Sequence, residues 1–257
     1  MRQLRTRHNQ LFLILRDHCL FLTRKQIERV LTLRTSTANR ELVWLVSGKF
    51  LARRYRADSF IHFQTPLYYL GELGWRMVGK PTADYKSYQR NIEERSGPQI
   101  DHLLAVNDVV LKFILESNVK RIIGGEDGVW REAFGFGNLP DAWIQYGGGE
   151  AFIEVDRGSE RAGVVAEKFS NYANFKTSGS YGLIFPGCEF RVLFVTTTED
   201  RIGALEQLPN SNDIWFATMD EFLREKLDHP HWFSLSGFHA LPTLRKKEVQ
   251  ELRQAQP

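Results

Sequence analysis

The sequence predicts a mixed α+β fold, in which a small N-terminal domain of helices with a basic hairpin precedes an α/β domain. Three observations predict this fold. Apolar residues recur at helical spacing in residues 9–48, two short strand-like runs follow, and beyond residue 99 an apolar helix leads into β-branched runs separated by glycines. Because strands and helices alternate in the second part, we expect a sheet with helices packed on it.

Charge divides the chain in the same way. Residues 1–90 hold 17 Lys and Arg against 6 Asp and Glu, a net charge of +11, whereas residues 91–257 hold 17 against 25, a net charge of −8. Basic domains attract polyanions, and nucleic acid is the commonest polyanion in the cytoplasm. We therefore expect the first third to bind double-stranded DNA; a solvated surface with a chance bias is the alternative.

Composition excludes several classes of protein. Charged residues make up 25% and apolar residues 42% of the 257 residues, which is ordinary for a globular protein and excludes global disorder. Two cysteines, Cys19 and Cys188, are too few for a disulfide framework or a four-thiolate zinc site. The apolar runs are too short to span a bilayer, and a secretory core is missing, so we expect a cytoplasmic protein with no membrane partner.

Two helices are expected at the start of the chain. Residues 9–18 contain a cluster of leucine and isoleucine typical of a short apolar helix. Thr23 is followed three residues later by Gln26, which is the spacing of a capping box. The second helix should therefore begin at Thr23 and end near Leu31.

A third helix should present polar residues at its N-terminal end. Thr35 or Ser36 can cap it, and Gly48 suits the left-handed position after its last turn. Such a helix enters the major groove in helix-turn-helix proteins, where Asn and Arg can make paired hydrogen bonds to base edges. The candidate DNA-binding residues are Arg34, Ser36, Thr37, Asn39 and Arg40. Pairing of Arg40 with Glu41 or Glu28 is the alternative.

A basic hairpin is expected after the third helix. Residues 50–56 and 60–63 resemble two short strands around a turn at 57–59, and residues 67–78 close the domain with a strand and a short helix. A hairpin in this position is the wing of a winged helix, and it would contact phosphates or the minor groove. Its candidate DNA-binding residues are Arg53, Arg54 and Arg56. Winged helices also mediate protein–protein contacts, which is the alternative.

The expected domains are a winged helix over residues 1–80, a linker over 81–98, an α/β domain over 99–243 and a charged tail over 244–257. The α/β domain should begin with a long helix from residue 99. The expected strands are 121–123, 142–146, 151–155, 191–196 and 214–217, and the later helices are 160–175 and 200–208.

Three carboxylates stand out in the α/β domain. Asp141 opens one expected strand, while Glu154 and Asp156 lie two apart on the next, so both side chains should leave the same face. Glycines at 147–149 permit a tight hairpin between the two strands. Three neighbouring carboxylates repel each other unless a cation lies among them, so we expect a Mg²⁺ site and, with it, phosphodiester chemistry.

The three carboxylates can also be accommodated without a metal. They can be solvated acids on an exposed strand, or Arg157, Arg131 or Lys168 can neutralise them. Lys168 lies on the next expected helix and either points back to the site, as a further catalytic residue, or is exposed. Glu132 would add a ligand if its segment folds beside the sheet.

The chain resembles the replication-relaxation family of plasmid and integrative-element proteins, from about Asn9 to Phe216. The most specific block is 152–160, Phe-Ile-Glu-Val-Asp-Arg-Gly-Ser-Glu, followed by Lys168 and Tyr172; looser matches are 69–74, 102–107 and 139–141. The resemblance implies a DNA-binding protein of mobile elements, associated with plasmid replication and relaxation of plasmid DNA.

The second domain is also similar to the PD-(D/E)xK nuclease fold. This similarity implies that Asp141 is the first acid, that Glu154 is the second, and that Asp156 stands where the motif usually has lysine. Other nucleases of this fold carry the lysine on a neighbouring helix, a role that Lys168 could fill. The departure implies either an active enzyme or a degenerate nuclease that only binds DNA or a partner.

Three functions are compatible with these patterns. The first is a DNA-binding accessory or initiator protein of a plasmid or other mobile element, whose second domain assembles with replication or transfer proteins. The second is a metal-dependent endonuclease or nickase that uses Asp141, Glu154 and Asp156 to hold Mg²⁺. The third is a winged-helix transcriptional regulator. Symmetric DNA sites often recruit dimers, so a homodimer is also compatible.

Overall fold

The protein forms two compact units, Met1–Leu111 (unit 1) and Lys112–Pro257 (unit 2). The computed structural model describes residues 3–55, 65–117, 119–124, 140–146, 149–185, 189–228, 232–234 and 237–239. Helices and two sheets occur together, so the fold is of the mixed α+β class predicted from the sequence. Among the helices of the described part, none has the length and apolar character needed to cross a bilayer.

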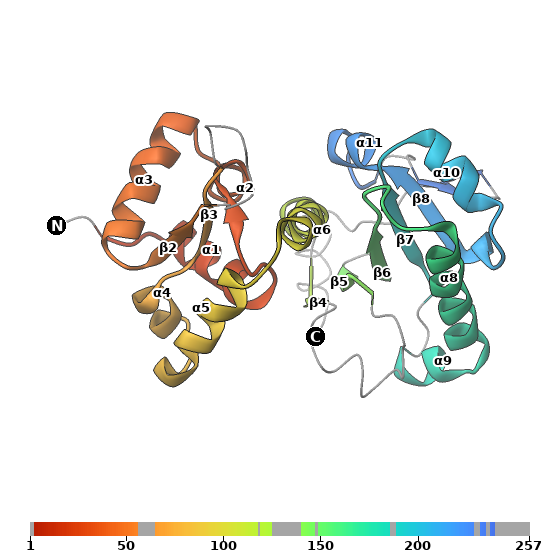
Figure 1. Ribbon diagram of the computed structural model, residues 1–257, viewed down its shortest axis with the longest axis horizontal. Coiled ribbons are helices and arrows are strands. Elements are labelled where there is room, and N and C mark those ends of the chain that lie inside the picture. Colours follow the sequence, from red (N-terminus) through yellow and green to blue (C-terminus); the bar gives the residue numbers. More distant parts are fainter. Residues whose placement is uncertain are drawn as a thin grey trace, which may run out of the picture. The chain divides into compact units, whose positions relative to one another are not determined.

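Unit 1 begins with three helices and a small sheet (Figure 1). Its elements are, in chain order, α1 (Thr6–Asp17), β1 (Leu22–Thr23), α2 (Arg24–Leu31), α3 (Thr35–Ser47), β2 (Leu51–Arg54), β3 (Leu67–Leu70), α4 (Glu72–Met77), η1 (Thr82–Asp84), α5 (Tyr85–Glu93) and the first part of α6 (Gly97–Glu116). The strand order is β1-β3-β2, and both pairs are antiparallel.

The capping signals explain where α2 and α3 begin. Thr23 accepts a hydrogen bond from the backbone of Gln26, and the Gln26 side chain bonds back to Thr23, which confirms the predicted capping box. The predicted caps of α3, Thr35 or Ser36, are wrong by one or two residues, because Arg34 is its N-cap and Thr35 is already helical. The backbone of Arg34 is extended, and its side chain makes no capping bond.

The predicted left-handed conformation of Gly48 is also wrong. Gly48 has φ −83°, and the following residue, Lys49, has the positive φ of 58°. A Cβ at Gly48 would lie 2.8 Å from two ring atoms of Phe50 and 3.3 Å from the Trp44 carbonyl oxygen. Glycine is favoured here by close packing and not by its backbone angles.

The hairpin of unit 1 pairs β2 with β3, with Leu51 opposite Leu70 and Arg54 opposite Leu67. The second strand predicted from the sequence, 60–63, lies outside the described part of the chain, as does Arg56. The strand and short helix predicted over 67–78 are present as β3 and α4.

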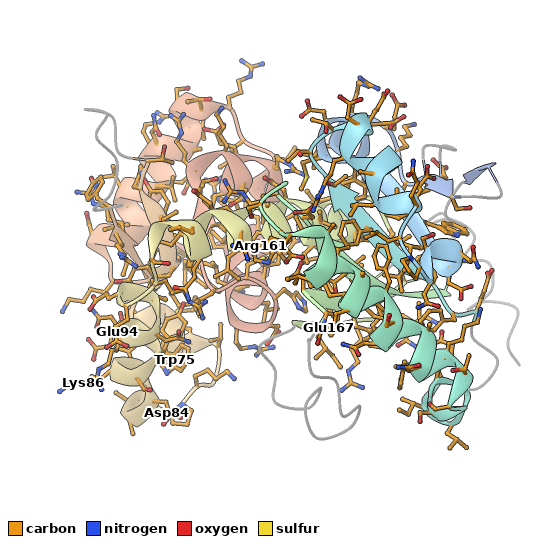
Figure 2. The ribbon with its side chains drawn as sticks, turned by 45° about the vertical axis from the view of Figure 1, so that its right-hand side comes forward. Trp75, Asp84, Lys86, Glu94, Arg161 and Glu167 are labelled. Carbon is orange, nitrogen blue, oxygen red and sulfur yellow. The ribbon has the colours of Figure 1, made fainter. Side chains whose placement is uncertain are left out.

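The segment expected as a linker, 81–98, lies within unit 1, where it contains η1 and α5 and packs against the preceding elements. Trp75, which is labelled in Figure 2, stacks on Tyr88 with ring centroids 4.4 Å apart and donates its indole N–H to the Pro81 carbonyl at 2.8 Å. The Tyr88 hydroxyl accepts from the Leu70 backbone and donates to the Leu20 carbonyl. Buried Ile92 joins the core formed by Phe21, Leu67, Tyr69 and Ile100.

Unit 2 is built on one mixed sheet in the order β10-β9-β8-β7-β6-β5-β4 (Figure 1). Its elements are the end of α6, then β4 (Arg121–Gly124), β5 (Ala142–Tyr146), β6 (Gly149–Val155), α8 (Ala162–Thr177), α9 (Ser180–Ile184), β7 (Val192–Thr196), α10 (Glu199–Glu206), η2 (Ser211–Asp213), β8 (Ile214–Thr218), α11 (Met219–Arg224), β9 (Trp232–Ser234) and β10 (Gly237–His239). Strands β4, β5 and β6 are antiparallel neighbours, whereas β6, β7 and β8 run parallel.

The parallel strands are central and buried, which explains their continuous apolar sequences. Every residue of β7 is buried. On one face of the sheet, α8 and α10 contribute Phe169 and Leu205 to a core that also contains Phe152, Phe194 and Phe216 from the strands. The five strands predicted from the sequence are thus present, and the helices predicted at 160–175 and 200–208 correspond to α8 and α10.

The close approach of α4 to the chain before β2 makes Gly74 a sensitive position. A Cβ at Gly74 would overlap the carbonyl oxygen of Phe50, a backbone atom that cannot rotate away. We expect Gly74→Ala to lower the free energy of unfolding by about 2 kcal/mol, measured by urea denaturation. Gly203→Ala in α10 is the control, since nothing lies within 4 Å of its Cβ, and should raise stability by about 0.5 kcal/mol. Equal changes in the free energy of unfolding for Gly74→Ala and Gly203→Ala would contradict the close approach of Gly74 to Phe50.

Candidate functional site

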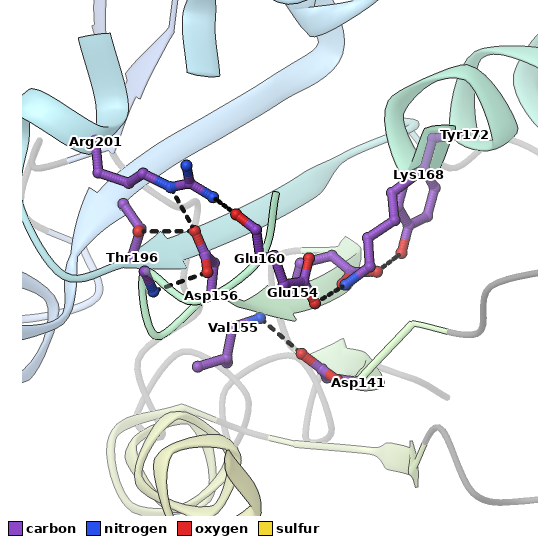
Figure 3. Close-up of polar contacts among 10 residues, drawn as sticks. Asp141, Glu154, Val155, Asp156, Glu160, Lys168, Tyr172, Thr196 and Arg201 are labelled. Carbon is purple, nitrogen blue, oxygen red and sulfur yellow. Dashed lines mark hydrogen bonds and ion pairs between the residues drawn. The ribbon is translucent and has the colours of Figure 1, made fainter. Parts of the chain in front are cut away.

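The candidate site lies where β6 ends, on the side of the sheet covered by α8 and α10. Strand β6 carries Glu154 and leads directly into Asp156, and Asp141 immediately precedes the neighbouring strand β5. Helix α8 supplies Lys168 and Tyr172, which are four residues apart and therefore share one helix face. Figure 3 shows these side chains with their polar contacts.

Glu154 is the centre of a buried cluster. Its side chain is 2% exposed; one carboxylate oxygen lies 3.0 Å from the Lys168 ammonium, and the other accepts a 2.6 Å hydrogen bond from the Tyr172 hydroxyl. Lys168 also bonds Glu160 at 2.8 Å. We call Glu154, Glu160, Lys168 and Tyr172 the Glu154 cluster. Of the two alternatives for Lys168, the geometry agrees with a side chain that points back to the carboxylates and contradicts an exposed one, since 12% of it is exposed.

Asp141 belongs to the same region through the backbone. Its carboxylate accepts a 2.7 Å hydrogen bond from the Val155 amide, and its own amide donates to the Ile153 carbonyl. The Asp141 side chain therefore adds one hydrogen bond between the two chain segments, just beyond the last backbone-paired residues of β5 and β6. The charge of Asp141 also acts on Glu154 and Lys168, because it raises the pKa of both groups.

Asp156 is turned toward a different partner (Figure 3). Its carboxylate lies 2.7 Å from the Arg201 guanidinium of α10 and accepts hydrogen bonds from the Gly158 amide and the Thr196 hydroxyl. Arg201 also donates to the Glu160 carbonyl oxygen at 2.7 Å. The structure thus brings Glu154 and Lys168 together with Asp141 nearby, but it places Asp156 in a separate ion pair.

Burial sets the protonation of the Glu154 cluster. Burial raises the pKa of Glu154 to about 7; Asp141 adds to this rise, and Lys168 and Tyr172 oppose it. Burial by itself lowers the pKa of Lys168, but the surrounding carboxylates raise it above its ordinary value. Burial and the neighbouring Glu154 raise the pKa of Tyr172, so this hydroxyl remains a hydrogen-bond donor.

The carboxylates are satisfied by donors of the protein itself. Both oxygens of Glu154 accept from side chains, and Asp156 is paired with Arg201. Within the described ranges, no group of three His, Cys, Asp or Glu residues is placed to hold a metal ion. In this arrangement Asp156 is paired with Arg201 and not shared with Asp141 and Glu154, which differs from the expected Mg²⁺ held by all three carboxylates. Mg²⁺ binding stays a prediction.

The candidate DNA-binding residues of α3 lie at its start. Four of them are exposed and Thr37 is half-buried; the exposed ones are Arg34, Ser36, Asn39 and Arg40. Asn39 accepts a long hydrogen bond, 3.5 Å, from Arg24 of α2. The two acids considered as partners of Arg40 have other contacts, since Glu28 pairs with Arg24 and buried Glu41 pairs with Arg7.

The arginines of the hairpin have different roles. Arg53 is exposed, and its guanidinium lies 5.3 Å from the centre of the Tyr55 ring. Arg54 donates to the carbonyl oxygens of Ile92 and Arg95, so it ties β2 to the end of α5. Of the predicted hairpin residues in the described part, Arg53 is the one oriented to solvent, whereas Arg54 has a structural contact.

The sequence comparison assigns the chain to a family. A family model described as replication-relaxation matches residues 13–184. The chain belongs to the replication-relaxation family. The match runs from α1 to α9 and includes Asp141, Glu154, Asp156 and Lys168, and membership of the family associates the chain with replication and relaxation of mobile-element DNA. No curated protein and no solved structure matched the chain.

Two partners of the site, Thr196 and Arg201, were not predicted from the sequence. Both follow residue 184, outside the family match, and both lie at least 40 residues from Asp156 in the chain. Glu160 and Tyr172 entered the prediction only as part of the family resemblance. The spacing of Lys168 and Tyr172 on one helix face was the available signal for a shared partner.

The burial of Glu154 predicts a pH-dependent requirement for Lys168. The pKa of Glu154 is raised to about 7 from an ordinary 4.5, so the folded protein holds this proton more tightly than the unfolded chain does. The resulting contribution to the free energy of unfolding is fully present below pH 4.5 and is lost as pH rises through 7. Without Lys168 the pKa of Glu154 would rise further, so at pH 8 the folded state would have to keep this carboxyl protonated or bury its charge with no ammonium beside it. We expect Lys168→Met to lower the free energy of unfolding by about 3 kcal/mol at pH 8 and by much less at pH 5, measured by urea denaturation.

Two further variants complete this test. Lys176→Met on the same helix is the control, because its pair with Asp213 is exposed and should contribute below about 1 kcal/mol at either pH. Adding Glu154→Gln to Lys168→Met removes the buried charge and should remove the pH dependence. If Lys168→Met lowered the free energy of unfolding equally at pH 5 and pH 8, ionisation of Glu154 would not be the cause of the loss.

Proposed function

We propose that this protein binds double-stranded DNA of a plasmid or other mobile element through unit 1, and that unit 2 serves as a nuclease-like platform for replication or transfer proteins. The observation that carries the proposal is the start of α3, where Arg34, Ser36, Asn39 and Arg40 are exposed together in the basic part of a replication-relaxation protein. Exposed Arg and Asn side chains at the start of a helix suit contacts to base edges and phosphates.

The order of elements in unit 1 supports a winged helix. Helices α2 and α3 are joined by three residues, 32–34, and the hairpin of β2 and β3 follows α3 directly. A helix-turn-helix of this kind places its second helix in the major groove, and a hairpin beside it can contact the flanking backbone. Arg53, exposed on β2, is the proposed phosphate contact of the hairpin.

The order of elements in unit 2 supports a nuclease-like domain. Among the described elements, a helix, three antiparallel strands, two helices and a strand parallel to β6 follow in the order α6, β4, β5, β6, α8, α9 and β7. Asp141, Glu154 and Lys168 stand at the positions that the PD-(D/E)xK resemblance assigns to its two acids and to a lysine carried on the helix. The neutralisation of Asp156 by Arg201 favours a platform over an active Mg²⁺-dependent nuclease.

DNA binding by α3 predicts a large effect of Arg40. We expect Arg40→Ala to weaken binding to a duplex selected from random sequence by about tenfold or more, measured by fluorescence anisotropy. Arg53→Ala should weaken binding to all duplexes and reduce the salt slope by about one. Lys86→Ala is the control, because Lys86 is an exposed cation of unit 1 on α5 (Figure 2). If Lys86→Ala weakened binding as much as Arg40→Ala, general charge and not α3 would be responsible.

The platform interpretation predicts no metal-dependent cleavage. Supercoiled plasmid incubated with the protein and Mg²⁺ or Mn²⁺ should stay supercoiled while its mobility shifts on a gel. Glu154→Gln is the matched variant, since it keeps the size of the side chain and removes its charge. Nicked or linear product from the unaltered protein, and none from Glu154→Gln, would instead establish the alternative of a metal-dependent endonuclease or nickase.

A further inference from the structure

Val43 is an exposed apolar residue on the helix proposed to enter DNA. It lies in the middle of α3, and 64% of its surface is exposed. The buried side of α3 is complete without it, because Ala38, Leu42 and Leu45 pack into unit 1 and are at most 2% exposed. Val43 therefore has no part in the core of unit 1.

Val43 lies at the centre of the outward face of α3. It follows Asn39 by four residues and Arg40 by three, and Ser36 precedes it by seven, so all of these side chains project from one face of the helix. Ser47, four residues further on, is also exposed. The outward face thus consists of polar residues around one branched apolar side chain.

The free protein gains little from valine at this position. A β-branched residue lowers helix propensity, and its exposed methyl groups stay in contact with water. Such a residue becomes favourable when a ligand covers it. The cations beside it, Arg40 on the same face and Arg34 at the helix start, favour a polyanion as that ligand.

We propose that Val43 contacts the C5-methyl group of a thymine in the major groove and so determines sequence preference at one base pair. The inference rests on the proposed function, because it requires α3 to lie in the groove. The major-groove edge of a base pair carries hydrogen-bonding groups, and thymine adds an apolar methyl group there. Val43 matches that methyl group, while Asn39 and Arg40 match the polar edges of neighbouring bases.

The test combines a protein variant with a DNA variant. The full-length protein first selects a duplex from random sequence, and each thymine of that duplex is then replaced singly by deoxyuridine, which lacks the methyl group. We expect one such replacement to weaken binding about fourfold, as for one buried methyl group. Val43→Ala should weaken binding to the thymine duplex by a similar factor and should show no further loss on the deoxyuridine duplex.

A matched control separates this contact from a general effect of losing a valine. Val164 is likewise an exposed valine on a helix, 43% exposed on α8, and Val164→Ala should leave both the affinity and the response to deoxyuridine unchanged.

Three outcomes would overturn the proposed contact of Val43 but leave DNA binding through α3 intact, provided that Arg40→Ala still weakens binding. They are a selected pool without sequence preference, a site at which no thymine responds to deoxyuridine, and an equal response in the unaltered protein and Val43→Ala. Absence of binding to any duplex would overturn the proposed function as well.

Discussion

The structure of unit 2 depends on the burial of one carboxylate. Glu154 is enclosed between the sheet and α8, and a buried charge is tolerated only when donors surround it. Lys168 and Tyr172 supply those donors from consecutive turns of α8, which fixes the rotation and position of that helix on β6. The apolar core between the sheet and α8 adjoins the Glu154 cluster, since Phe152 and Phe169 belong to that core together with Tyr172.

The same constraint applies one step further along the chain. Asp156 follows β6 and is equally buried, and Arg201 of α10 neutralises it while also bonding the Glu160 carbonyl oxygen. Because Glu160 holds Lys168 with its side chain, the two ion pairs are connected through one residue. The end of β6 is therefore tied to two helices by charge, in a place where the spacing of the acids suggests a metal.

The two sides of α3 differ in unit 1: one side carries apolar residues that pack in the core, and the other carries exposed residues. Ala38, Leu42 and Leu45 enter the core, whereas Ser36, Asn39, Arg40 and Val43 face outward. The hairpin shows the same separation between neighbours, since Arg54 holds α5 while Arg53 is exposed. Consecutive arginines that look equivalent in sequence thus differ because strand residues alternate between two faces.

The sequence by itself determined the local elements and the family. Capping at Thr23, β-branched runs between glycines and the block 152–160 depend on neighbours in the chain, so α2, the strands β4 to β8 and the replication-relaxation membership could be predicted, whereas β9 and β10 were not. Only the tertiary structure decided which charges meet. The pairing of Asp156 with Arg201, the bonds from Arg54 to the end of α5 and the close approach of Gly74 to the Phe50 carbonyl oxygen join groups through space, and no short-range pattern encodes their distances.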